Sequence, residues 1–200
     1  MAVIILSGGL SKRMGQDKAS LVLEDSTLLQ TLIARFAGRF GPVIVVSRPG
    51  QDLAIDNADV VRDIHVGKGP LGGLHAGLLA SPDDANFVLA CDMPFADVEL
   101  ANYVLSRLNG HDAAIPLLER GPEPLFAAYR RSCLPTIEAN LEAGILAMRG
   151  LLDKVDTLYL PESDLRQHDP TLRSFLNINT PDEYLEVRRM DKVRPHRLEE

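Results

Sequence analysis

The sequence predicts an α/β protein built on a mainly parallel central sheet. Short apolar runs alternate with helical patterns along most of the 200 residues, as in chains of right-handed βαβ crossovers. The first run, Ala2–Leu6, is apolar without interruption, which is typical of a strand covered on both faces. Ligands of such sheets bind at the carboxyl ends of the strands, so we expect function in the loops that follow them.

The individual elements are expected in the same alternating order. Strands are expected at Ala2–Leu6, Pro42–Ser47, Ala58–Asp63, the run that leads to Cys91 and Asp92, Asp112–Pro116, a segment after Glu123, and Thr157–Leu160. Helices are expected at Ser26–Ala37, from Pro70, at Asp97–Leu108, before Gly144, at Ile145–Leu152 and from Pro181. Ser26 or Thr27 can cap the first helix and Gly38 can end it.

The composition limits the classes of partner. With 21 Lys and Arg against 28 Asp and Glu, the formal charge of −7 argues against general binding of nucleic acid or of an anionic membrane. Apolar stretches fall short of the ~18–20 residues of a membrane span. Cys91 and Cys133 are the only cysteines, which leaves no disulfide framework or zinc set and favours the cytoplasm. We expect one domain at 1–189 and a frayed tail at 190–200.

The loop after the first strand has the character of a phosphate-binding loop. It reads LSGGLSKRMGQDK, with Gly8 and Gly9 followed by Arg13 and Lys18. Paired glycines let successive backbone N–H groups converge on an anion. Arg13 can grip a phosphate through two bonds, and Lys18 supplies a point charge. A solvated turn is the alternative, but the loop's length and its place at the strand end favour phosphate binding.

Three better-known motifs are weaker interpretations of the same regions. Gly15 is followed by Gln-Asp-Lys, so the loop is not a Walker A motif, and the G-x-S-x-G pattern of a nucleophile elbow is absent around Ser11. The segment 67–72 spells G-x-G-x-x-G with Asp92 about twenty residues further on. It follows the third strand rather than the first, so it indicates a helix N-terminus that contacts a nucleotide more than a dinucleotide-binding fold.

Five segments, in order, resemble one known family. They are LSGGLSKRMGQDKA at the first loop, GPLGGLHAGL (Gly69–Leu78), ACDMPF (Ala90–Phe95), EPLFAAYRRSCLP (Glu123–Pro135) and FLNINTPDEY (Phe175–Tyr184). Together they resemble the molybdenum cofactor guanylyltransferases, small nucleotidyltransferases that join GMP from GTP to molybdopterin. The resemblance implies a Rossmann-like three-layer nucleotidyltransferase fold. Residues of about 1–110 would form a nucleotide-binding half and those of about 111–189 an acceptor-binding half.

The resemblance also implies roles for single residues. Asp92 would be the Mg²⁺ ligand, Lys18 would engage the nucleotide phosphates, and Asn177 and Asn179 would contact the acceptor. Arg13 is expected to be catalytic together with Lys18 and Asp92, because its charge can stabilise the phosphate oxygens during transfer. With the residues expected from the loops and the helix N-terminus, the full nucleotide-binding set is Leu6, Ser7, Gly8, Gly9, Lys18, Ser47, Asp63, Gly69, Pro70, Leu71 and Asp92. Two positions depart from the family, which usually has Ala at Ser7 and commonly Asn at Ser47.

Several of these residues have structural interpretations as well. Asp92 could cap a turn, and Asp63 could form an ion pair with Arg62 or Arg48. Asn179 could stabilise the turn that follows it.

Taken together, the resemblance implies Mg²⁺-dependent transfer of GMP from GTP to molybdopterin with release of pyrophosphate. The acceptor phosphate is itself a nucleophile, so the absence of a poised His or Cys agrees with this chemistry. Transient contacts are expected with proteins that deliver molybdopterin and with molybdoenzymes. The alternatives are a relative that uses CTP on the same acceptor, one that acts on a sugar phosphate, and a nucleotide-binding module without catalysis.

Overall fold

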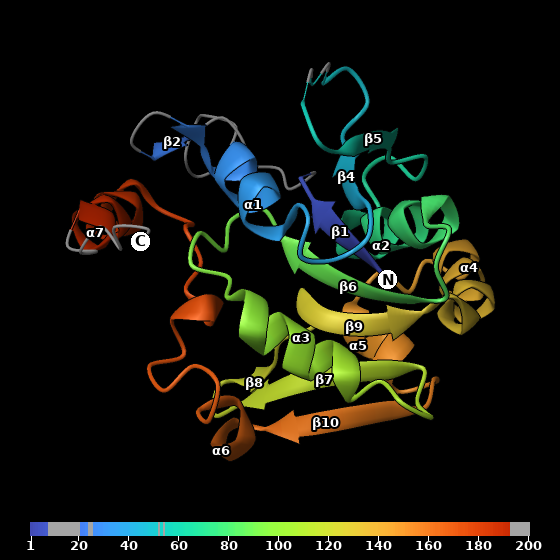
Figure 1. The fold of residues 1–200 in the computed structure, drawn as a ribbon. Coiled ribbons are helices and arrows are strands. Elements are labelled where there is room, and N and C mark those ends of the chain that lie inside the picture. Colours follow the sequence, from blue (N-terminus) through green and yellow to red (C-terminus); the bar gives the residue numbers. More distant parts are fainter. Residues whose placement is uncertain (8–20, 24–25, 52, 54, 193–200) are drawn as a thin grey trace.

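A seven-membered path of strands forms the central sheet of the molecule (Figure 1). The computed structural model describes residues 1–7, 21–23, 26–51, 53 and 55–192. The strands in spatial order are β10 (Thr157–Pro161), β7 (Ala113–Leu118), β9 (Phe126–Arg130), β6 (Ala85–Ala90), β1 (Ala2–Leu6), β4 (Val43–Ser47) and β5 (Asp59–Arg62). The short β8 (Gly121–Pro122) pairs with β7, and β2 (Val22–Leu23) pairs with β3 (Ser26–Thr27) in a separate hairpin.

The sheet is parallel except at β9 and at the short β8, which is antiparallel to β7. The pairs β1–β4, β1–β6, β4–β5 and β7–β10 are parallel, whereas β9 is antiparallel to both β6 and β7. The mainly parallel sheet predicted from the sequence is therefore confirmed. The antiparallel β9 was not predicted, and it brings the amino end of that strand to the edge where its neighbours have their carboxyl ends.

Helices cover both faces of the sheet (Figure 1), which confirms the predicted three-layer α/β architecture. The helices are α1 (Leu28–Phe36), α2 (Gly69–Ala80), α3 (Val98–Ser106), α4 (Leu134–Glu142), α5 (Met148–Leu152), α6 (Glu162–Leu165) and α7 (Pro181–Lys192). Successive side chains of a strand point to opposite faces. Accordingly Val3 and Ile5 pack in the core cluster that contains α1 and α3, whereas Ile4 packs in the cluster that contains α2, α4 and α5.

The ends of the helices follow the capping signals of the sequence. Thr27 caps α1 in a capping box with Gln30, as one of the two predicted caps. Gly38 follows that helix with a φ of +74°, a conformation that suits glycine. The helix expected from Ile145 begins only at Met148, because Ala147 has the extended backbone of an N-cap residue.

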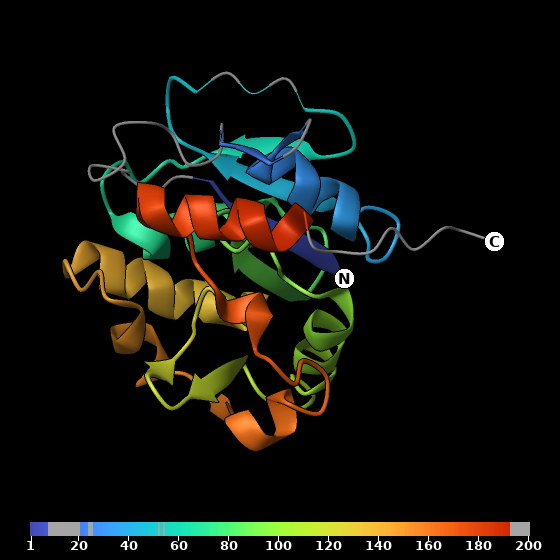
Figure 2. The ribbon, with the colours of Figure 1, turned by 90° about the vertical axis from the view of Figure 1, so that its left-hand side faces the viewer.

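The last helix, α7, lies against the outside of the layers (Figure 2). Val187 of α7 packs in a small apolar cluster with Leu28 of α1, Phe95 and Ile178. The helix includes Met190, so it overlaps the start of the tail expected at 190–200, of which residues 193–200 lie outside the described part.

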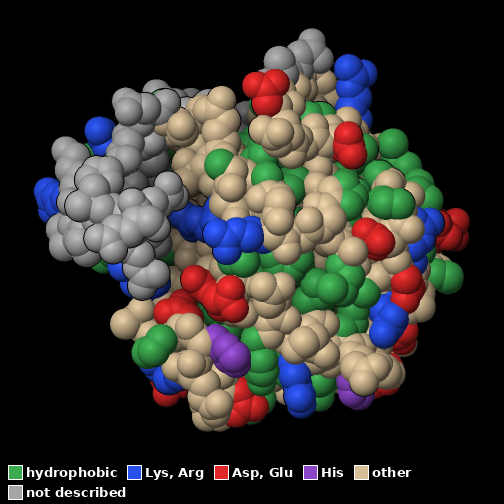
Figure 3. All heavy atoms as spheres, viewed as in Figure 1, with side chains coloured by type: hydrophobic (Ala, Val, Ile, Leu, Met, Phe, Trp, Pro, Cys, Tyr) green, Lys and Arg blue, Asp and Glu red, His purple; other side chains and the backbone are tan. Residues whose placement is uncertain are grey.

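Charged side chains of both signs are interspersed on the face shown in Figure 3. Among the helices that the structure describes, none is both long and apolar enough to cross a membrane.

Candidate functional site

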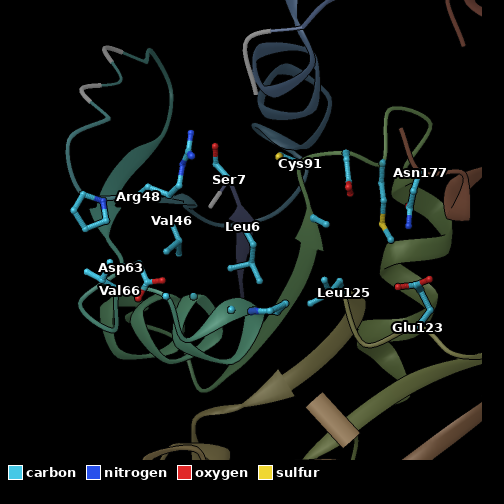
Figure 4. Close-up of a pocket in the computed structure, with 18 residues that line it drawn as sticks. Leu6, Ser7, Val46, Arg48, Asp63, Val66, Cys91, Glu123, Leu125 and Asn177 are labelled. Carbon is cyan, nitrogen blue, oxygen red and sulfur yellow. The ribbon is translucent and has the colours of Figure 1, made fainter. Parts of the chain in front are cut away.

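A cavity of about 670 Å³ opens at the carboxyl ends of β1, β4, β5 and β6 (Figure 4). This is the place where a parallel sheet binds its ligands. The cavity wall includes many of the residues that the sequence singled out, namely Leu6, Ser7, Asp63, Gly69, Pro70, Asp92 and Asn177. They come from segments that lie far apart in the sequence, which the fold brings to one edge.

The end of β1 contributes its backbone mainly to the sheet. The Leu6 carbonyl accepts a hydrogen bond from the Cys91 N–H (3.1 Å), and the Ser7 N–H donates to the Val46 carbonyl (2.9 Å). The Ser7 side chain is buried, and its Oγ has no hydrogen-bond partner among the described residues. Ser7 therefore places a hydroxyl group at the cavity wall.

The start of α2 forms a second part of the wall. Gly67 and Gly69 have φ values of +76° and +66°, a left-handed conformation that residues with a Cβ rarely adopt. The N-cap residue, Lys68, makes no capping hydrogen bond with its side chain. The first backbone N–H groups of a helix lack partners within the helix, and the helix dipole favours an anion beside them. The predicted nucleotide contact of Gly69 and Pro70 suits this end of the cavity.

Asp63 follows β5 and lies beside the start of α2, near Val66 in Figure 4. Its Oδ1 accepts a hydrogen bond from the backbone N–H of His65 (2.8 Å). The helix approaches closely here, since a Cβ on Gly72 would lie only 3.2 Å from that oxygen. The turn therefore fixes the position of the carboxylate at this side of the cavity.

Asp92 follows β6 after one intervening residue, Cys91, and its carbonyl accepts a hydrogen bond from the Ile178 N–H (2.9 Å). This bond fastens the segment before α7 to the strand end and brings Asn177 to the cavity wall. The Asn177 Oδ1 is buried, and no described group bonds to it. Asp92 and Asn177, which were assigned to metal and acceptor from the sequence, thus lie at the same cavity.

Glu123 is a further acidic residue of the cavity wall, to which the sequence analysis gave no role. Its side chain is only 14% exposed, and Arg120 Nη2 donates to its Oε2 (3.0 Å). Burial raises the pKa of Glu123, the charge of Asp92 adds to the rise, and the hydrogen bond from Arg120 opposes it. Glu123 reaches the cavity because β9 is antiparallel: a bond from the Ala90 N–H to the Leu125 carbonyl (2.9 Å) holds the amino end of that strand at this edge of the sheet.

Three predicted residues are placed away from the cavity wall. Ser47 is buried, and its Oγ donates to the Val61 carbonyl (3.3 Å). Leu71 is fully buried in the core beneath α2. Asn179 is exposed, and its backbone N–H donates to Glu183 Oε2 (2.6 Å) at the start of α7. The predicted residues Gly8, Gly9, Arg13 and Lys18 lie outside the described residues.

Among the charged side chains of the described cavity wall, acidic groups outnumber cationic ones. The wall carries one cationic side chain, Arg48, and three carboxylates, Asp63, Asp92 and Glu123. Within the described ranges, no three His, Cys, Asp or Glu side chains are grouped so as to hold a metal ion by themselves. An anionic ligand in this cavity therefore requires further positive charge.

Comparison with known proteins gives one consistent result. Residues 3–158 match the family described as the MobA-like NTP transferase domain. A relative from Peptoclostridium acidaminophilum, named a probable molybdenum cofactor guanylyltransferase, is 34% identical over 189 residues, which cover 91% of this chain and 86% of that protein.

Solved structures agree with this match. Molybdopterin-guanine dinucleotide biosynthesis protein A from Archaeoglobus fulgidus has a TM-score of 0.83 and 29% identity, covering 96% of this chain and 99% of that chain. The 2-C-methyl-D-erythritol 4-phosphate cytidylyltransferase from Thermus thermophilus has a TM-score of 0.73 at 17% identity, covering 96% and 98% of the two chains. The second similarity is one of fold alone.

Proposed function

Because the chain belongs to the MobA-like NTP transferase family, and is thus a nucleotidyltransferase, we propose that it transfers GMP from GTP to molybdopterin. The products are molybdopterin guanine dinucleotide and pyrophosphate. The observation that carries this proposal is the single cavity in which Asp92, at the end of β6, and the N-terminus of α2 lie together.

The two sides of the cavity suit two substrates. Asp63 and the start of α2 belong to the half of about 1–110, which we assign to GTP. Glu123 and Asn177 belong to the half of about 111–189, which we assign to the acceptor. In this arrangement the phosphates of both substrates meet near Asp92, between the two halves, where they can be held in line for transfer.

A magnesium ion fits the donor set of the cavity. The wall has three carboxylates and one arginine, so a triphosphate bound there needs cationic charge to offset the repulsion. Mg²⁺ is held by one or two carboxylates together with substrate phosphates, and Asp92 is the residue that would hold it. When bound, the ion would neutralise charge on the phosphate oxygens.

Other residues of the chain would bind the phosphates and stabilise the charge that develops during transfer. The N–H groups at the start of α2, which have no partners within the helix, would bind and orient phosphate oxygens. Arg13 and Lys18 of the first loop would stabilise the charge that develops on the transferred and leaving groups. The acceptor phosphate needs no base to attack, which agrees with a cavity wall that carries no histidine among its described residues.

The proposal is tested by measuring pyrophosphate release with each of the four NTPs, with and without molybdopterin and Mg²⁺. We expect release only with GTP, acceptor and metal together. Asp92→Ala should abolish turnover while the circular dichroism spectrum and melting temperature stay near those of the wild type. Asp153→Ala, at an exposed residue paired with Arg149, is the control and should keep full activity.

Three other results would contradict parts of the proposal. Release with CTP, or with a sugar phosphate as acceptor, would replace the proposed substrates by those of a related transferase. Nucleotide binding without release under any condition would make the chain a binding module. Near-full activity of Asp92→Ala would remove the metal assignment.

The proposed substrates also indicate the cellular compartment and the partner proteins. GTP is an intracellular nucleotide, so we place the reaction in the cytoplasm. Molybdopterin must be delivered, and its dinucleotide passed on, so we propose transient contacts with the proteins that perform these two steps.

A further inference from the structure

We propose that Glu123 recognises the pterin ring of the acceptor, with its carboxylate accepting hydrogen bonds from the ring N–H and the exocyclic amine of the 2-amino-4-oxo edge. The inference rests on the proposed function and deepens it, because it names the group that selects the acceptor.

The position of Glu123 assigns it to the acceptor side. In Figure 4, Glu123 and Asn177 face the cavity from the side opposite Asp63 and Val66. Glu123 lies between β8 and β9, in the half assigned to the acceptor, whereas Asp63 and the start of α2 lie in the nucleotide half. A nucleotide bound against α2 would leave the Glu123 side for the second substrate.

The charge of Glu123 determines which part of that substrate can lie against it. Asp92 is near enough for its charge to act on the Glu123 carboxyl. A phosphate beside Glu123 would be repelled, whereas at Asp92 the proposed Mg²⁺ would offset the repulsion. We therefore assign the acceptor's phosphate to the Asp92 end and its N–H donors to Glu123. The pterin edge offers two adjacent N–H donors, arranged like those of a guanidinium, which a carboxylate binds through two parallel hydrogen bonds.

Neighbouring groups fix the position of the Glu123 carboxylate. Arg120 Nη2 donates to Oε2 (3.0 Å) and is itself anchored on the Phe175 carbonyl (2.9 Å). The backbone of Leu125 also stabilises the ionised carboxyl. A carboxylate has about four acceptor positions, so these two donors leave room for a ligand. Arg120 is 56% exposed while Glu123 is 14% exposed, so the arginine supports the carboxylate from the solvent side.

The test compares two ligands on two proteins. Pterin and lumazine have the same fused ring, but lumazine carries an oxygen in place of the 2-amino group and so lacks one of the two donors. Their binding is followed by the quenching of their fluorescence, with the nucleotide site saturated by a non-hydrolysable GTP analogue and Mg²⁺. Saturation prevents the ligands from occupying the guanine position, whose edge carries the same pair of donors.

We expect the wild type to bind pterin about tenfold more tightly than lumazine. With lumazine, one buried oxygen of the Glu123 carboxylate would have no N–H donor to bond, which lowers the affinity. Glu123→Gln should reduce this preference to about twofold or less and leave the affinity for the GTP analogue unchanged. Glu119→Gln is the matched control, since Glu119 is exposed in the same part of the chain and does not line the cavity.

The inference is overturned if the wild type does not bind pterin or does not prefer it, or if Glu123→Gln keeps the wild-type preference. It is also overturned if the variant weakens binding of the GTP analogue as much as binding of pterin. A purely structural role for the Arg120–Glu123 pair would change the melting temperature without changing the ratio of the two affinities. Failure of the proposed function would be seen separately, as a lack of pyrophosphate release by the wild type.

Discussion

Asp169 is a buried carboxylate whose hydrogen bonds hold the segment that leads to Asn177. It is 9% exposed, and its Oδ2 accepts bonds from the backbone N–H and the Oγ of Ser174, both at 2.8 Å. Ser174 Oγ in turn accepts a bond from the Asp97 N–H (3.2 Å) at the start of α3. Burial raises the pKa of Asp169, but the hydrogen bonds from Ser174, Arg173 and Thr171 outweigh it, and the net shift is downward.

The lowered pKa gives Asp169 a pH-dependent share in stability. Because the ionised form is favoured in the folded state, its contribution is fully present above the unfolded pKa of about 4 and is lost as pH falls through the folded value. Asp169→Asn should lower the free energy of unfolding at pH 7 by about 1–3 kcal/mol, the range for a hydrogen-bonded charge. Urea denaturation at pH 7 and at pH 3.5 should show this difference shrinking at the lower pH.

The control for this prediction is Asp153→Asn, which removes an exposed ion pair and should change stability little at either pH. A difference between Asp169→Asn and the wild type that stays constant with pH would show that the charge of Asp169 has no part in it.

At single positions, the sequence predicted the cavity residues whose place follows from a strand end. Leu6, Asp63 and Asp92 each come last in, or directly after, a predicted strand, and all three line the cavity. Asn179, predicted together with Asn177 to contact the acceptor, lies outside the cavity wall, because the segment turns there into α7. Glu123 gave no signal of its own, since an acidic residue before proline also suits a solvated turn.

Between elements, the contact of α2 with β1 depends on glycines. Gly77 lies against Ile4, and a Cβ on it would overlap Ile4 Cγ2 and lie 3.3 Å from Val46 Cγ2. Gly73, one turn earlier on the helix, lies against Leu6 with more room, since its Cβ would be 3.4 Å from Leu6 Cδ2. A substitution at Gly77 therefore tests the packing of the helix on the sheet, whereas one at Gly73 tests the shape of the cavity, which Gly73 lines.

Gly77→Ala should lower the free energy of unfolding by about 1–3 kcal/mol, because the added methyl overpacks the interface with Ile4. Gly73→Ala should keep or slightly raise stability, since alanine favours a helix by about 1 kcal/mol, and should instead raise the KM for GTP. Thermal melting and steady-state kinetics of the two variants check this. Equal melting temperatures for the two would contradict the packing argument.

The elements that the sequence predicted best are those with a local signal. The buried run Ala2–Leu6 is β1 with the expected bounds, and Thr27 caps α1. The position of β9 between β6 and β7 could not be read in this way. Its alanine-rich pattern fits a parallel or an antiparallel neighbour equally well, and the choice depends on pairing with strands that are distant in the sequence.

Across the whole molecule, binding at the cavity is linked to stability. The cavity wall joins the ends of β1 and β6, the start of α2 and the segment before α7, so a ligand there ties elements from the first residues to residue 177. A ligand that binds only the folded state raises the free energy of unfolding by about 2.7 kcal/mol when its concentration is 100 times its Kd. GTP with Mg²⁺ should therefore raise the melting temperature of the wild type.

The same linkage tests the first loop without a measurement of catalysis. Lys18→Ala should weaken binding by ~1.5–3 kcal/mol, the range for a hydrogen bond to a charged group, and should lose most of the GTP-induced rise in melting temperature. The melting temperature without GTP should match that of the wild type if Lys18 acts on the ligand. Arg149→Ala, at a residue whose side chain is 88% exposed, is the control and should keep the full rise. If Lys18→Ala lowers the melting temperature without GTP and keeps the full rise with it, then the first loop stabilises the fold and does not bind the triphosphate.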